Sequence, residues 1–124
     1  MNPKDSGHED FVMVHRKDLD AVIDLVKTRR LQLRDMAVFN ALIAEMEPTT
    51  GKVRVTASHL SERLGVKLPV CISALTRLRK EFLVSKVHDK RSGSYYFLLN
   101  PYVASVGGPQ RRGHLWQQFQ DSLE

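Results

Sequence analysis

The chain has 124 residues, of which 42% are hydrophobic and 27% charged, a composition typical of one compact globular domain. No apolar stretch approaches the ~18 residues that a membrane-spanning helix needs, and residues 1–10 are polar and partly acidic, unlike the basic start of a secretory signal. We therefore expect a cytoplasmic protein with no membrane partner. The single cysteine, Cys71, excludes an intramolecular disulfide and a multi-cysteine zinc site.

The positive charge is confined to one half of the sequence. The net charge of +5 comes from 19 basic and 14 acidic residues. Residues 1–65 hold ten of each sign, whereas residues 66–124 hold nine Lys or Arg and four Asp or Glu. A concentration of basic side chains attracts polyanions, because neutralised phosphates release their condensed counterions. The second half is therefore the candidate nucleic-acid-binding part.

The first half predicts two helices and an edge strand. Residues 11–14 form a short apolar run, which we interpret as a strand or a packing arm. Apolar residues recur at helical spacing through residues 18–27 and again through residues 33–47, where Pro48 is expected to end the helix. Residues 52–55 alternate polar and apolar side chains, as a short edge strand does.

Two short helices separated by a glycine follow. Thr56 is a suitable N-cap, because its hydroxyl can accept a hydrogen bond from the first free backbone N–H groups. Gly65 can take the left-handed conformation that ends one helix and turns tightly into the next, with Val66 packed in the angle. The second helix is expected over residues 67–82. Its buried face is expected to hold Cys71, Ala74, Leu75 and Leu78.

A β-hairpin is predicted directly after these helices. Residues 83–87 and 95–99 favour strands, and residues 88–94 form a polar, basic turn between them. Alternation along the second strand predicts that one of Tyr95 and Tyr96 is buried and the other exposed.

A last amphipathic helix is expected over residues 111–123. Trp116 and Phe119 could either complete the core or form a dimer interface, and we favour the interface. We therefore expect a flexible tail at residues 1–10, a winged-helix DNA-binding domain at residues 11–104 and a C-terminal helical extension at residues 105–124.

This order of elements predicts an α+β winged helix-turn-helix domain with N-terminal helices, a hairpin wing and a C-terminal helix. The sequence also resembles RepL-type plasmid replication proteins and their phage relatives. The resemblance rests on the opening Phe11-Val12-Met13-Val14, on Tyr96-Phe97-Leu98-Leu99-Asn100-Pro101 at the end of the wing, and on the following Gly107-Gly108. It implies DNA binding at a plasmid origin to start replication, although the same domain also serves transcriptional repressors.

The predicted function is therefore sequence-specific binding of double-stranded DNA, with the second helix in the major groove and the wing along the backbone. The first turns of that helix are apolar where Arg, Lys, Asn or Gln would read bases, so apolar contact with a thymine methyl is the alternative mode of reading. The expected DNA-contacting residues are Lys67, Leu68, Val70, Ser73, Thr76, Arg77, Lys80, Lys86, Lys90 and Arg91.

A second hypothesis is a protein-interaction module, in which the apolar turns of this helix bind a partner regulator or replication protein. No phosphate-binding glycine loop, nucleophile elbow or paired carboxylates indicate an enzyme. We expect no cofactor and no metal, since the five histidines have neither i,i+4 pairing nor partner cysteines. Homodimerisation and contact with replication or transcription proteins are left open.

Overall fold

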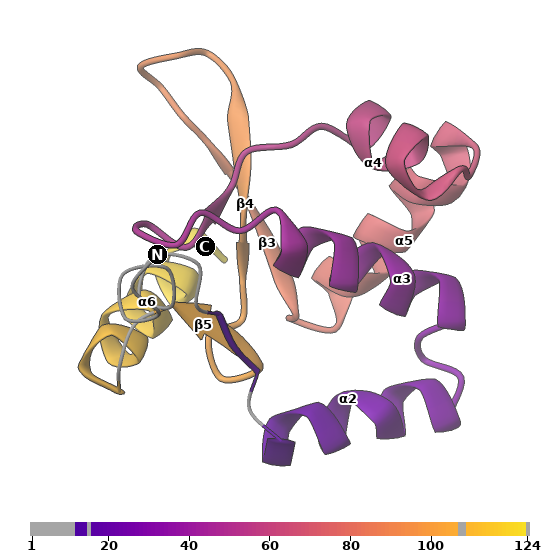
Figure 1. Cartoon of the computed structure of the whole chain (residues 1–124), viewed down its shortest axis with the longest axis horizontal. Helices are drawn as coiled ribbons and strands as arrows, with labels where there is room; N and C mark the ends of the chain where they lie inside the picture. The colour runs from indigo at the N-terminus through magenta and orange to yellow at the C-terminus, as the bar shows by residue number, and fades with distance from the viewer. Residues whose placement is uncertain (1–11, 15, 107–108, 124) are drawn as a thin grey trace, which may run out of the picture.

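The computed structural model describes residues 12–14, 16–106 and 109–123, and side-chain positions for residues 20–104 and 113–123. Within these ranges the chain is an α+β structure with five helices and a three-stranded antiparallel sheet (Figure 1). The helices are α2 (Arg16–Lys27), α3 (Leu33–Ala44), α4 (Ala57–Leu64), α5 (Leu68–Lys80) and α6 (Pro109–Ser122).

The three-stranded sheet has the order β2-β4-β3, so the hairpin β3 (Val84–His88) and β4 (Tyr95–Leu99) is joined on the β4 side by β2 (Lys52–Val53). Val53 pairs with Phe97, and Lys86 pairs with the same residue from the other side. The expected edge strand is thus confirmed, although it covers two residues only. A separate pair joins β1 (Val12–Val14) to β5 (Ala104–Val106), which settles the opening apolar run as a strand.

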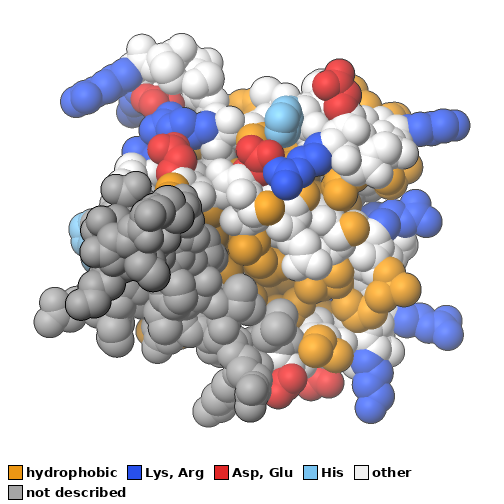
Figure 2. Space-filling view, viewed as in Figure 1, with side chains coloured by type: hydrophobic (Ala, Val, Ile, Leu, Met, Phe, Trp, Pro, Cys, Tyr) orange, Lys and Arg blue, Asp and Glu red, His pale blue; other side chains and the backbone are white. Residues whose placement is uncertain are grey.

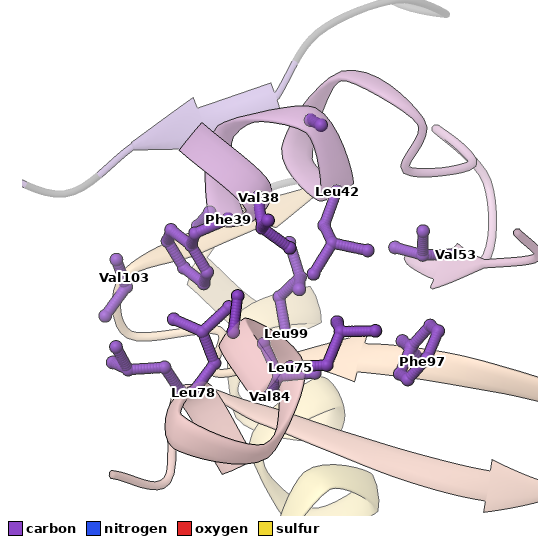
Figure 3. Packing of buried hydrophobic residues seen from close by; sticks show 14 of the residues in the cluster. Val38, Phe39, Leu42, Val53, Leu75, Leu78, Val84, Phe97, Leu99 and Val103 are labelled. Carbon is purple, nitrogen blue, oxygen red and sulfur yellow. The ribbon is translucent and has the colours of Figure 1, made fainter. Parts of the chain in front are cut away.

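One hydrophobic core lies between the sheet and helices α3 and α5 (Figure 3). Phe39 and Leu42 on α3 and Leu78 on α5 are completely buried, and each such side chain contributes about 1.5–3 kcal/mol through its removal from water. The sheet contributes side chains that face the same interior: Val53, Val84, Phe97, Leu99.

Helix α6 lies across the sheet from α3 and α5 and packs against β3 and β5 (Figure 1). Its Leu115 and Phe119 are buried within the chain, with Phe119 1% exposed. The expectation that Phe119 forms a dimer interface is therefore wrong, because this ring is already buried within its own chain. Trp116 is half-buried and makes an edge-to-face contact with Tyr102, with ring centroids 4.8 Å apart.

The helix ends differ from the predicted bounds by up to three residues, and two of these differences have a visible structural consequence. Helix α3 stops at Ala44, three residues before the expected Glu47. Helix α5 stops at Lys80, and Phe82 takes a left-handed conformation (φ 59°) in which its N–H and that of Leu83 donate to carbonyls of the last turn. Asn100 secures this end, since its side-chain amide donates to the Phe82 carbonyl at 3.1 Å. This asparagine therefore joins the end of α5 to the end of the hairpin.

Candidate nucleic-acid interface

Helices α4 and α5 are joined by the tight turn that the sequence predicts. The Thr56 hydroxyl accepts a hydrogen bond from the His59 N–H at 3.1 Å and so caps α4. Gly65 is left-handed (φ 68°), and its N–H donates to the last carbonyls of α4. The Ser61 hydroxyl crosses the turn and donates to the Val66 carbonyl at 2.6 Å. These contacts fix the position of the start of α5 relative to α4.

The inner face of α5 is attached to α3 by packing and by one ion pair. The predicted core residues Cys71, Ala74, Leu75 and Leu78 are all buried. Burial raises the pKa of the Cys71 thiol, which keeps it protonated and in the role of a small apolar side chain. Beside them, Arg77 donates from Nε and from a terminal nitrogen to the two carboxylate oxygens of Asp35, both at 2.8 Å.

The Asp35–Arg77 pair joins the start of α3 to α5 inside the protein. The Asp35 side chain is completely buried, and one of its oxygens also accepts the Gln32 N–H at 2.7 Å, at the start of α3. Hydrogen bonding to Asp35 raises the pKa of the Arg77 guanidinium, so this side chain stays charged. Although the sequence predicts Arg77 at the DNA, two of its guanidinium nitrogens are engaged by Asp35 and its side chain is only 29% exposed. We assign it to holding α5 on α3.

The outer face of α5 presents a row of exposed side chains with very different chemistry. Leu68 and Ile72 are 40% and 48% exposed, and Thr76 follows one turn later. The Thr76 hydroxyl donates to the Ile72 carbonyl at 3.0 Å. Lys80 continues the row at the end of the helix, where it is exposed. The face is thus apolar at its start and basic at its end.

Helix α4 is held in place by a small charged cluster. Glu45, at the end of α3, accepts hydrogen bonds from His59 (3.2 Å) and from Arg63, both on α4. The hydrogen bond from His59, with further contributions from Arg63, lowers the pKa of the Glu45 carboxyl below its ordinary value. The cluster therefore orients the helix that supports α5.

The hairpin projects from the sheet, with its tip at the opposite side of Figure 1 from the α4–α5 pair. The tip carries basic residues. Lys90 and Arg91 are exposed there. The Asp89 carboxylate accepts the Arg91 backbone N–H at 3.0 Å, and this bond lowers the pKa of Asp89. The turn is therefore ordered by Asp89, while the side chains of Lys90 and Arg91 extend outward.

The part of the hairpin next to the turn carries a second basic group that the sequence does not reveal. Lys52 Nζ lies 4.8 Å and the Arg54 guanidinium carbon 5.3 Å from the centre of the Tyr96 ring. On the opposite face, Lys86 Nζ lies 4.1 Å from the Tyr95 ring. Both tyrosines are half-buried, so the prediction of one buried and one exposed ring is wrong. The ring that alternation places on the outer face of the sheet is Tyr96, and the cationic side chains of Lys52 and Arg54 cover it.

The expected contact residues thus separate into three groups. Five of them are exposed along α5, where Lys67 is the N-cap: Lys67, Leu68, Ser73, Thr76 and Lys80. Lys86, Lys90 and Arg91 lie on the hairpin. Val70 is half-buried and Arg77 is bound to Asp35, so these two offer the least to a partner. Figure 2 shows the Lys and Arg side chains standing out from one side of the molecule and from the hairpin tip.

Asp35 is the most important residue that sequence reasoning overlooks. A signal for it exists: the apolar face of α3 contains Phe39 and Leu42, and Asp35 precedes them by four and seven residues, which places a carboxylate on the buried face. A buried acid requires a basic partner, but nothing in the spacing names Arg77, which is 42 residues away.

No group of three or more potential metal-ligating side chains occurs among the described residues. Within the same part of the chain, none of the helices combines the length and apolar character needed to cross a bilayer. No protein-family model, curated protein or solved structure matches the chain.

Proposed function

We propose that this protein binds double-stranded DNA as a winged helix-turn-helix domain. Helix α5 would enter the major groove and the β3–β4 hairpin would lie along the backbone. The observation that carries the proposal is the division of α5 into an anchored inner face and an exposed outer face, directly followed by a projecting hairpin with Lys90 and Arg91 at its tip.

Three features of the fold support this proposal. The order α3, β2, α4, α5 and hairpin, with β2 on the β4 side of the sheet, is the order that a winged helix requires. The Gly65 turn fixes α5 on α4, so a helix inserted in a groove would be held rigidly. Lys80 at the end of α5 and Arg91 at the hairpin tip provide exposed cations on both elements that would face the phosphates.

The experiment is a salt titration of duplex binding with charge-matched variants. For the wild type, the logarithm of the affinity should fall linearly with the logarithm of the salt concentration. The double variant Lys80→Ala/Arg91→Ala should lower the magnitude of this slope by about 2, because each phosphate that is no longer neutralised removes roughly 0.9 from it. The control Lys27→Ala/Arg34→Ala removes one Lys and one Arg from exposed positions on α2 and α3, so it changes the net charge identically.

The comparison of the two double variants decides the location of the interface. An unchanged slope in the control and a reduced slope in Lys80→Ala/Arg91→Ala supports the proposed surface. Equal reductions in both would show that only net charge matters and would remove α5 and the hairpin as the contact surface. A flat salt response of the wild type would contradict DNA binding itself.

A protein-interaction module is the second candidate, and the exposure of Leu68 and Ile72 favours it. Apolar side chains at this exposure on a helix face are suitable anchors in a groove of a partner protein. The variant Ile72→Glu would abolish such docking while leaving the exposed cations that bind a duplex. Loss of duplex binding in the same variant would instead assign Ile72 to the DNA surface.

The biological role is a proposal that rests on the resemblance to RepL-type proteins: replication initiation, or transcriptional control, in a plasmid or phage. Homodimerisation belongs to the same proposal. Selection of bound duplexes from a random pool, followed by location of the selected sequence at an origin or a promoter, distinguishes the two roles.

A further inference from the structure

The side chains of α5 that could reach base edges form a short chemical inventory. Cys71, Ala74, Leu75 and Leu78 are buried, Val70 is half-buried and Arg77 is bound to Asp35, which leaves five exposed side chains on the first three turns. These are Leu68, Pro69, Ile72, Ser73 and Thr76. None of them is an Arg, Lys, Asn or Gln, the side chains that form paired hydrogen bonds with guanine or adenine.

Thr76 is effectively apolar toward a partner. Its hydroxyl is engaged by the Ile72 carbonyl one turn earlier, so its methyl group is the part left for an outside contact. Leu68, Ile72 and Thr76 are spaced four residues apart and lie one above the other on the helix. Three aliphatic groups thus form one stripe about two turns long.

We infer that this stripe reads thymine by contact with its C5-methyl group, so the preferred sites are A·T-rich. The inference rests on the proposed DNA binding and adds the chemistry of its target. The thymine methyl is the apolar group that unmodified bases present in the major groove, and aliphatic side chains recognise it by burying it. In this mode the exposed Ser73, Lys67 and Lys80 would contact the phosphates of the two DNA strands, and such contacts carry no sequence information.

Four synthetic duplexes test the inference without knowledge of the natural site. An alternating A·T duplex is compared with the same duplex containing uracil, which lacks only the methyl group. An alternating G·C duplex is compared with one containing 5-methylcytosine, which adds the methyl at the same ring position. Affinity should fall about fourfold for each buried methyl group that the uracil duplex lacks and should rise when the cytosine is methylated.

Two serine variants at isoleucine positions locate the effect. Ile72 is 48% exposed on α5 and Ile23 is 54% exposed on α2, which lies on the far side of α3 from the α4–α5 pair in Figure 1. Ile72→Ser should reduce the preference for thymine over uracil, because it removes the middle member of the stripe, whereas Ile23→Ser should leave the preference unchanged. Because both positions are exposed, both variants should fold, and their thermal unfolding serves as the control.

The outcomes separate the inference from the function on which it rests. Equal, salt-dependent binding of the thymine and uracil duplexes overturns methyl reading and leaves DNA binding standing. A thymine preference that is undiminished in Ile72→Ser also overturns it, because the centre of the stripe would then contribute nothing to methyl recognition. Absence of salt-dependent binding to all four duplexes overturns the proposed function as well.

Discussion

The two sides of the α4–α5 pair are built on different principles. The inner side is anchored: Leu60 and Leu78 are completely buried, Asp35 holds Arg77, and Glu45 holds α4. The outer side of α5 exposes aliphatic side chains at its start and Lys80 at its end. Two cations only three residues apart, Arg77 and Lys80, therefore differ in their availability: Arg77 is bound to Asp35, whereas Lys80 is exposed. A count of basic residues on a helix does not identify which of them is available to a partner.

Among substitutions on the anchored side, Arg77→Ala should cause the largest loss of unfolding free energy. Arg77→Ala leaves the carboxylate of Asp35 buried without its cation, and removal of one partner of a buried pair costs about 3–5 kcal/mol. Urea unfolding followed by circular dichroism measures this loss. The control Arg79→Ala removes the same charge from an exposed position and should change stability by less than about 0.5 kcal/mol. Comparable losses of unfolding free energy in both variants would show that the Asp35–Arg77 pair contributes no more to stability than an exposed charge does.

Much of the anchored side is predictable because its signals are local. The helical spacing of Cys71, Ala74, Leu75 and Leu78 depends only on one helix, and so do the Thr56 cap and the Gly65 turn. The alternating strands of the hairpin are recognisable in the same way. The order of elements is therefore largely predictable. The differences are the helix ends, the length of β2 and the strand β5, which no local signal indicates and which pairs with β1.

The contacts that decide the roles of individual side chains are long-range, and they are not predictable. The partner of Arg77 is 42 residues away. Alternation predicts that Tyr96 is either exposed or buried, but Lys52 and Arg54 from before α4 cover its ring. Phe119 is expected at a dimer interface because no pattern in the sequence shows that α6 folds back on the sheet. In each case the tertiary fold brings together groups whose spacing carries no information.

The turn between the two helices offers a sharper comparison at about 1–2 kcal/mol. At Gly65, an added Cβ would meet nothing within 4 Å, so Gly65→Ala tests only the cost of a left-handed backbone (φ +68°) in an L-residue. That cost is about 1–2 kcal/mol. At Gly113 in α6 the space is equally open but φ is not positive, and Gly113→Ala should stabilise the protein by up to about 1 kcal/mol. Thermal unfolding of both variants checks the signs, and a stabilising Gly65→Ala would contradict the assigned turn.

The smallest and most conditional effect is expected at Glu45, which fixes α4 from outside the core. Folding lowers the pKa of Glu45, so its contribution to stability is fully present above the ordinary carboxyl pKa and disappears as the pH falls through the lowered folded value. Glu45→Gln should therefore cost up to about 1 kcal/mol at neutral pH, and this difference from the wild type should shrink in acid. The control Glu62→Gln, at an exposed position on α4, should show no such convergence. Urea unfolding at neutral and acidic pH makes the comparison. A Glu45→Gln difference that stays constant across this range would mean that the His59 and Arg63 contacts do not orient α4, and the support of α5 would then rest on the core and Asp35 alone.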